Sequence, residues 1–565
     1  MSDGIRLLNH VDPIPDLDYP RPQMRRDSFL SLDGIWDFCD AEIRVPFCPE
    51  SYASGFGILL EDDDIVFYHR TFSLPDGFHR GRVLLHFGAV DAVADVFVNG
   101  RRMGRHEGGY THFEFDITAA LEESGTNDLL VRVEDRLGDR VQPFGKQKRK
   151  RGGMWYTPVT GIWQSVWLES VPETYIRSLE IRTNAFPDET HEKAGAEIVA
   201  RLSDGTERME RIDVENPERW TPETPKLYPF ELSVGEDSVR SYFALREISV
   251  GKAGGFPRLF LNRKPYFFHG LLDQGYFQNG IYTPENAEEY QKDIKIIKYC
   301  GFNMLRKHIK IEADIFYALC DRMGVAVFQD FVENGGYSYV RDTVLPNVGI
   351  GLSRDDRKLN ADPKVREAFR KCVKETVEQL KNFPSVMYWT VFNEGWGQFN
   401  GAEMYREVKA LDPTRIVDTA SGWYRTAESD VYSEHVYFHA VKPIKRKKTA
   451  GDASENVGKP WVLSEYGGYT WAESGHVWNE RKQYGYKDFR TKEEYENRLY
   501  ECMERDVVRN IPYGLSADVL TQLSDVEDEV NGLITYDREI LKINAARFRA
   551  LGEKIKNIYE EMDYE

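Results

Sequence analysis

The chain has 565 residues, more than one hydrophobic core usually organises, so we expect several domains. Its formal net charge of −19 at pH 7 argues against a nucleic-acid partner, because phosphate binding needs a concentrated basic surface. No apolar run approaches the ~20 residues of a membrane span, and the first residues lack the basic start and apolar core of a signal peptide. We therefore predict a cytoplasmic protein with no membrane partner.

The six cysteines are scattered and form no C-x-x-C pair, so neither a disulfide framework nor a zinc site is indicated. In a reducing compartment they would be free thiols. The sequence predicts no metal and no other cofactor.

Residues 1–172 have the pattern of β-strands. Short alternating runs separated by Gly, Asn and Asp turns predict an all-β sandwich. A second β region over 173–247 has the size of a small immunoglobulin-like sandwich. The runs in the first region are 32–38, 65–74, 82–90, 93–100, 128–134 and 161–169.

From residue 248 onward, strand and helix patterns alternate. One predicted helix has Thr283 as N-cap and Pro284 at its first position and stops at Gly301; another starts at Asp362-Pro363. Eight strands with crossovers fit a (β/α)8 barrel. A doubly wound open sheet is the main alternative, but no G-x-G-x-x-G follows the first strand. The predicted strands are 265–270, 303–308, 325–331, 386–394, 415–419, 431–437, 461–465 and 514–520.

Ionisable residues gather at the ends of these strands, where barrel enzymes place their active residues. Glu394 ends the fourth strand and Glu465 the seventh, on roughly opposite sides of a barrel. Such a pair can hydrolyse glycosides without a cofactor, one protonating the leaving oxygen while the other attacks the anomeric carbon or activates water. A single such glutamate could equally be solvated or cap a helix. Further strand-end candidates are Arg306, His308, Asp330, Asn393, His435 and Tyr437.

Two motifs carry a family resemblance. VFNEGWGQ (391–398) resembles the acid/base signature of glycoside hydrolase family 2, and LSEYGG (463–468) resembles its nucleophile motif. Segments 95–118 and 152–169 are similar to the N-terminal sugar-binding jelly roll of that family, and 219–230 to its immunoglobulin-like domain. The resemblance implies a jelly-roll β-sandwich over 1–172, an immunoglobulin-like β-sandwich over 173–247 and a catalytic (β/α)8 TIM barrel over 248–565.

The resemblance also implies roles for single residues. Glu394 would be the general acid/base and Glu465 the nucleophile. Asn393 would bind the 2-hydroxyl of the sugar, and Tyr437 would donate a hydrogen bond to Glu465. Arg306 and His308 fit a substrate-binding position on the second strand, although relatives commonly have one more residue between the Arg and the His. Asp330 and His435 are candidates for contacts with sugar hydroxyls, with structural hydrogen bonding as the alternative.

The chain departs from the family pattern in two places. Thr521 stands where relatives place a Trp against the sugar, so Trp423, Trp471 or Trp478 would have to supply that surface. Glucuronidases of the family carry Asn-x-Lys before a G-[IL]-x-T-x-D-R stretch. Here that stretch is 532–538, but Glu529 and Asn531 precede it, which favours a neutral sugar over a uronate.

We therefore predict a retaining exo-β-glycosidase that acts on a small carbohydrate, with β-galactosidase-like specificity favoured. A β-glucuronidase or other uronidase is the first alternative. A non-catalytic carbohydrate-binding protein on an inactive barrel is the alternative from another class. The sequence leaves a homo-oligomer open. Two basic runs, 145–153 and 444–448, are either solvated loops or contacts for an anionic or extended substrate.

Overall fold

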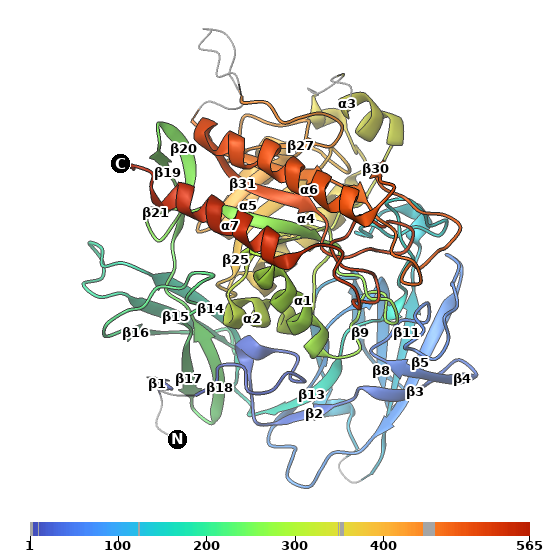
Figure 1. Ribbon diagram of the computed structural model, residues 1–565. Coiled ribbons are helices and arrows are strands. Elements are labelled where there is room, and N and C mark those ends of the chain that lie inside the picture. Colours follow the sequence, from blue (N-terminus) through green and yellow to red (C-terminus); the bar gives the residue numbers. More distant parts are fainter. Residues whose placement is uncertain are drawn as a thin grey trace.

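The computed structural model describes residues 4–8, 11–122, 125–347, 350, 355–444 and 458–564. Figure 1 shows two β-rich parts, drawn in blue to green in the lower half, and a part built of strands and helices above them. Within the described residues no helix is long and apolar enough to cross a membrane.

The first β part is a sandwich of two antiparallel sheets, called here the jelly-roll sandwich. Its inward positions alternate with outward ones, as in β11, where Leu129, Val131 and Val133 are fully buried. One sheet has the order β10 (Phe113–Asp116), β6 (Arg82–Phe87), β13 (Val166–Val171), β2 (Phe29–Ser31). The other has the order β4 (Ala41–Val45), β3 (Gly34–Phe38), β5 (Ile65–Phe72), β11 (Asn127–Glu134), β8 (Val93–Val98), β9 (Arg101–Glu107), and β7 (Val90–Asp91) pairs with β12 (Gly161–Ile162).

The second β part is a smaller sandwich of two three-stranded sheets. One sheet holds β14 (Ile176–Asn184), β15 (Gly195–Leu202) and β16 (Glu207–Asp213); the other holds β1 (Gly4–Leu7), β17 (Tyr228–Val234) and β18 (Asp237–Phe243). Strand β1 thus brings the start of the chain to this second sandwich rather than to the jelly-roll sandwich.

The third part is an eight-stranded parallel barrel, and the predicted fold class is confirmed. Each predicted strand corresponds to an observed one, and the first and last strands of the sheet, β26 and β27, lie against each other. The open doubly wound alternative is therefore wrong. The order is β26 (Ile416–Ser421), β25 (Val386–Asn393), β24 (Ala326–Asp330), β23 (Met304–Lys307), β22 (Phe268–Asp273), β31 (Leu515–Thr521), β28 (Trp461–Gly467), β27 (Tyr432–Val436).

Helices follow most of these strands: α1 (Ala287–Tyr299), α2 (Asp314–Met323), α4 (Pro363–Leu380), α5 (Gly401–Leu411), α6 (Lys492–Asp506) and α7 (Ala545–Glu560). The predicted start of α4 after Asp362 is confirmed, since the Asp362 carboxylate accepts from Lys364 N. The predicted start of α1 at Pro284 is wrong. The Thr283 hydroxyl donates to the carbonyl oxygen of Trp163 in the jelly-roll sandwich instead of capping, so the helix begins three residues later.

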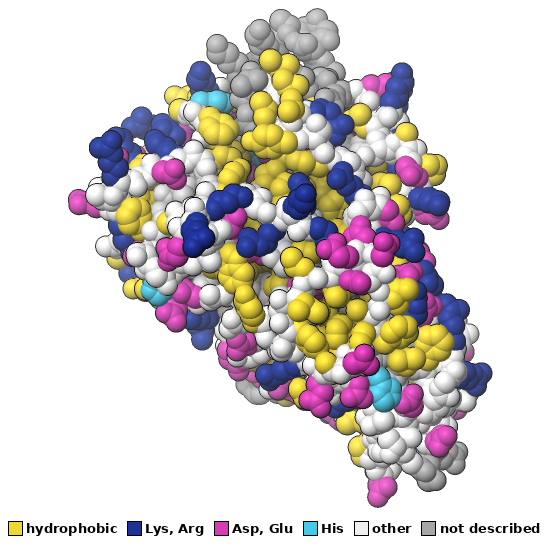
Figure 2. Space-filling model, turned by 90° about the vertical axis from the view of Figure 1, so that its right-hand side faces the viewer, with side chains coloured by type: hydrophobic (Ala, Val, Ile, Leu, Met, Phe, Trp, Pro, Cys, Tyr) yellow, Lys and Arg dark blue, Asp and Glu magenta, His cyan; other side chains and the backbone are white. Residues whose placement is uncertain are grey.

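Smaller elements complete the chain. A hairpin of β19 (Ile248–Ala253), β20 (Phe256–Leu261) and β21 (Lys264–Pro265) leads into the barrel, and β29 (Tyr469–Thr470) pairs with β30 (Lys487–Asp488). A short helix α3 (Leu345–Asn347) precedes α4. All six cysteines are free, and only Cys39 is exposed. On the face drawn in Figure 2, basic and acidic side chains are interspersed around hydrophobic areas.

Candidate active site

The two predicted carboxylates meet at the C-terminal mouth of the barrel. Glu394 follows β25 in a left-handed conformation (φ 54°), held by a 2.9 Å hydrogen bond from its N–H to the carbonyl oxygen of Ser421. Glu465 lies in β28, where the ladder to the neighbouring strands is irregular. One oxygen of each carboxylate and a ring nitrogen of His435 all lie within 4.8 Å of one another.

Arg306 holds three of the predicted residues together. Its guanidinium donates to Asp330 Oδ1 (2.9 Å), Glu465 Oε1 (3.0 Å) and Asn393 Oδ1 (2.9 Å). The side chain is fully buried, so these charged hydrogen bonds form away from water, where they are strong. Because Asn393 accepts through its carbonyl oxygen, its NH2 group is the donor left for a ligand.

The carboxyl group of Glu465 is held in the ionised form. Burial alone would favour the neutral acid, but the charges of His435 and Arg306 outweigh it and lower the pKa of Glu465 to about 2. The hydroxyl of Tyr437 donates to Glu465 Oε2 and adds to this effect. An ionised, oriented carboxylate is what a nucleophile requires.

His435 lies between the two carboxylates, which favours structural hydrogen bonding, the alternative that the sequence left open for this residue. Its Nδ1 is 2.8 Å from Glu394 Oε1 and 3.5 Å from Glu465 Oε2. Its Nε2 is 3.0 Å from the Ser421 hydroxyl, which itself donates to Ser464 Oγ. Nε2 therefore carries a hydrogen, and a proton lies between Nδ1 and Glu394. His435 positions the acid/base candidate.

Asp330 and His308 form a buried pair beside Arg306. His308 Nδ1 lies 2.7 Å from Asp330 Oδ2, while the other oxygen accepts from Arg306. Burial lowers the pKa of His308 to about 4, so its ring is neutral near pH 7. Both oxygens of Asp330 are thus occupied by protein donors, which favours the structural alternative for this residue.

The aromatic side chains near Glu394 and Glu465 differ in part from the predicted Trp423, Trp471 and Trp478. The Tyr437 hydroxyl also lies 3.1 Å from Thr521 Oγ1, and its ring stacks on Tyr486 with centroids 4.2 Å apart. Trp423 donates to the carbonyl oxygen of Glu394 (3.0 Å) and so belongs to the site. Trp471 instead donates to Glu473 Oε2 (3.1 Å), and within the described residues it makes no hydrogen bond to either of the two carboxylates.

A loop of the jelly-roll sandwich reaches this mouth. Gly145 N donates to the carbonyl oxygen of Glu333 (3.2 Å), the residue whose side chain accepts from Asn393 N (2.7 Å). The next residue, Lys146, is 9% exposed, and its charge acts on His308, Glu333 and Glu529. The sequence left the basic run 145–153 open as a solvated loop or a substrate contact. In the fold, Lys146 of this run points to the barrel. Residues 445–448 of the second run lie outside the described residues.

Glu529 also belongs to the mouth of the barrel. It is 3% exposed, and its carboxylate accepts from the Tyr156 hydroxyl and from Asn531 Nδ2 (2.9 Å). Burial raises its pKa, while the hydrogen bond from Tyr156 and the charge of Lys146 act in the opposite direction. The site thus combines a cation from the jelly-roll sandwich, Lys146, with a carboxylate from the barrel, Glu529.

The chain matches three family models. They are described as "Glycosyl hydrolases family 2, sugar binding domain" over residues 59–172, "Glycosyl hydrolases family 2" over 171–246 and "Glycosyl hydrolases family 2, TIM barrel domain" over 257–557. A β-galactosidase of Thermoanaerobacter pseudethanolicus is 23% identical over 415 residues, which cover 66% of this chain and 51% of that protein. The chain spans between 37% and 51% of the length of the first three curated relatives.

Solved structures with the same fold cover almost the whole chain. A β-glucuronidase from an uncultured Clostridium sp. has a TM-score of 0.72 at 20% identity and covers 94% of this chain and 99% of its own. A β-galacturonidase of Eisenbergiella tayi bound to galacturonate has a TM-score of 0.69 at 20% identity, with 94% and 98% covered. The TIM barrel family model alone matches residues 257–557, which are more than half of the 565 residues of this chain. The chain therefore belongs to glycoside hydrolase family 2.

Proposed function

We propose that the protein is a retaining exo-β-glycosidase with Glu465 as nucleophile and Glu394 as general acid/base. The observation that carries this proposal is the approach of the two carboxylates to within 4.8 Å. Retaining glycosidases hold their carboxyl groups ≈ 5–5.5 Å apart, whereas inverting ones leave ≈ 6.5–9.5 Å for a water molecule. The names of the relatives, β-galactosidase and β-glucuronidase, support a terminal β-linked sugar as substrate.

The reaction follows from the contacts of each residue. Glu465, ionised and held by Arg306 and Tyr437, attacks the anomeric carbon while Glu394 gives a proton to the departing glycosidic oxygen. A glycosyl ester on Glu465 results. Glu394 then removes a proton from water, whose oxygen displaces Glu465 from the anomeric carbon and restores the starting configuration. His435 holds Glu394 in place through both steps.

The sugar that fits best is neutral, with galactose favoured. Glu529 carries the only charge of its immediate hydrogen-bonding group with Tyr156 and Asn531, and a carboxylate there repels a uronate. Each of its oxygens accepts one protein hydrogen bond and keeps a second lone pair for a sugar hydroxyl. The charge of Lys146, which also acts on Glu333, offsets part of the negative charge of Glu529 without forming an ion pair with it.

A uronidase is the second candidate, and Lys146 is the observation that favours it. Among the residues that the structure describes, no carboxylate forms an ion pair with its ammonium group, although the side chain is almost buried. Structural relatives named β-glucuronidase and β-galacturonidase support the same alternative. In this case Lys146 would take the role of the cation that the Asn-x-Lys element supplies elsewhere in the family.

Glu529→Gln separates the two candidates on matched nitrophenyl β-galactoside and β-glucuronide. For a neutral sugar, kcat/KM on the galactoside falls about ten- to a hundred-fold, because charged hydrogen bonds to hydroxyls are lost. The value on the glucuronide rises, because the repelling charge is gone. Glu527→Gln is the matched control, since that buried carboxylate accepts from Thr157 N and pairs with Arg151 (3.4 Å) instead of with Tyr156 and Asn531. If the wild type prefers uronides and Lys146→Met abolishes that preference, the protein is a uronidase. If the wild type hydrolyses no glycoside of a panel, the result favours the non-catalytic binding protein.

Tyr437→Phe tests how the nucleophile is held. Without the hydroxyl that donates to Glu465, the pKa of Glu465 rises from about 2, so the carboxylate becomes protonated at higher pH. The acid limb of kcat/KM therefore moves to higher pH, and the plateau falls about ten- to a hundred-fold. Tyr466→Phe is the control, because that hydroxyl donates to Asp518 (2.9 Å). An unchanged acid limb in Tyr437→Phe would show that Tyr437 does not act on Glu465.

A further inference from the structure

Three ligand-type side chains converge on the four-stranded sheet of the jelly-roll sandwich, far in the sequence from the catalytic motifs. His86 on β6 and Glu114 on β10 are direct cross-strand partners. His112, in the loop before β10, is the third. His86 Nδ1 lies 3.1 Å from His112 Nε2 and 3.2 Å from Glu114 Oε2, and one ligand atom from each of the three side chains lies within 4.8 Å of the other two.

We propose that His86, His112 and Glu114 form a binding site for a zinc ion. Zinc prefers imidazole nitrogens at ≈ 2.0–2.1 Å and carboxylate oxygens at ≈ 2.0–2.2 Å in a tetrahedron, whose ligand atoms are therefore about 3.3 Å apart. The two distances from His86 Nδ1 are close to that edge length. A simple hydrogen bond accounts for only one of these two short distances, because a single ring nitrogen carries at most one hydrogen.

The groups around the three ligands suit a metal. His86 Nε2, which has no hydrogen-bond partner in the described residues, lies 3.7 Å from Glu169 Oε2, and Glu169 is fixed by Arg26 (2.8 Å). Zinc-binding imidazoles usually donate their second ring N–H to such a carboxylate, so His86 Nε2 would have to move closer to Glu169 when the ion binds. The rings of His86 and His112 both stack on Trp167, at 4.9 and 5.6 Å between centroids, which fixes their planes.

Arg21 is the rival cation. Its Nη1 lies 3.8 Å from Glu114 Oε2, beyond hydrogen-bond distance, while His86 Nδ1 lies 3.2 Å from the same oxygen. An ion bound among the three side chains would therefore replace the contact between His86 and Glu114.

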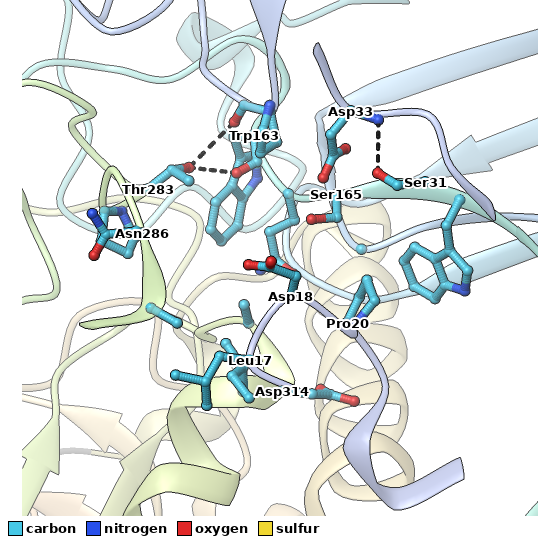
Figure 3. Close-up of a pocket in the computed structure, with 18 of the residues that line it drawn as sticks. Leu17, Asp18, Pro20, Ser31, Asp33, Trp163, Ser165, Thr283, Asn286 and Asp314 are labelled. Carbon is cyan, nitrogen blue, oxygen red and sulfur yellow. Dashed lines mark hydrogen bonds between the residues drawn. The ribbon is translucent and has the colours of Figure 1, made fainter. Parts of the chain in front are cut away.

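The fourth coordination position has a route from solvent. His112, Arg21 and Trp167 line a cavity of about 680 Å³ between the jelly-roll sandwich, the N-terminal segment and the barrel. Figure 3 shows this cavity, with Asp33 and Ser165 on the sandwich side, Leu17, Asp18 and Pro20 on the N-terminal segment, and Thr283, Asn286 and Asp314 on the barrel side. Water from this cavity can complete the tetrahedron.

An ion here would stiffen the contact between two domains. The backbone N–H of His112 donates to Gln379 Oε1 (3.2 Å) and the Thr111 hydroxyl to Glu375 Oε2 (2.9 Å), both on α4 of the barrel. Metal bound to His112 would fix the loop that makes these contacts. This role does not depend on the proposed glycosidase activity.

The test uses the full chain, stripped of metal with a chelator and titrated with Co²⁺. We expect one ion per chain with the visible absorption bands of tetrahedral Co²⁺, displaced by Zn²⁺, and a higher Tm with Zn²⁺ present. His112→Gln and Glu114→Gln each remove one ligand and should abolish both effects. His106→Gln is the matched control, since that imidazole stacks on Phe113 in the same sandwich without joining the cluster.

Two results would overturn the proposal. One is a wild-type protein without tetrahedral Co²⁺ bands or without a rise in Tm. The other is binding that persists in His112→Gln and Glu114→Gln but is lost in Glu465→Gln or His476→Gln, which would move the ion to another group of ligand-type side chains. Circular dichroism of the metal-free variants checks their fold, and either ligand variant alone suffices for the decision.

Discussion

Replacing Glu465 with Gln is expected to lower hydrolysis of every glycoside by roughly 10⁴-fold or more, because the amide cannot form the glycosyl ester. The effect should be independent of the leaving group, since the variant lacks the atom that attacks. Arg306 can still donate to the amide oxygen, and the Tyr437 hydroxyl can accept from the amide NH2 group, so the fold and substrate binding should survive. The measurement is kcat/KM on aryl glycosides together with Kd for the product sugar.

Glu434→Gln is the matched control for removing a half-buried carboxylate from the adjacent strand of the barrel. Glu434 lies on the adjacent strand β27 and accepts from Trp461 Nε1 (3.0 Å), a bond that the amide oxygen of Gln can also accept. Its activity should match the wild type. Full activity in Glu465→Gln would remove this residue from the mechanism.

Replacing Glu394 with Ala should affect substrates according to their leaving group. A poor leaving group such as an alkyl alcohol needs protonation, so its hydrolysis falls about 10²–10⁴-fold, the usual contribution of a general acid. A dinitrophenyl glycoside needs little protonation and still forms the glycosyl-enzyme, which then accumulates because water lacks its base. Steady-state rates and burst kinetics on both kinds of substrate measure the difference.

Azide distinguishes the roles of the two glutamates. In Glu394→Ala the vacated face admits azide to the glycosyl-enzyme, so added azide should raise the rate and give the β-glycosyl azide. In Glu465→Ala, azide should instead attack the substrate directly and give the inverted α-azide. A β-azide from Glu465→Ala would mean that the two roles are exchanged.

Local patterns in the sequence predicted much of the fold. The eight barrel strands are buried apolar runs, and the N-cap at Asp362 depends on neighbouring residues only, so both were readable. The start of α1 was not, because the Thr283 hydroxyl bonds to Trp163, 120 residues earlier. The domain boundaries after residues 172 and 247 stay predictions, and strand β1 shows that the first residues pair with the second sandwich.

The residues of the candidate active site also divide into those that the sequence could predict and those that it could not. Glu394, Glu465 and Tyr437 stand at strand ends, where the barrel geometry brings them together. Lys146 could not be singled out among the cations of the run 145–153, because its direction depends on how two domains pack. The sequence likewise could not show that His435 faces Glu394, since that contact depends on the positions of two different strands. Tertiary packing decides these contacts.

The most direct test of the mechanism is the site of covalent labelling by a 2-deoxy-2-fluoro glycoside with an activated leaving group. Such a compound slows the second step more than the first, so the glycosyl-enzyme accumulates and survives digestion for mass spectrometry. Our account predicts one fluorosugar per chain, on the peptide that contains Glu465, with turnover restored slowly as the label is hydrolysed. A label on the peptide that contains Glu394, or hydrolysis of ordinary substrates that releases the inverted sugar without any labelled enzyme, would contradict it.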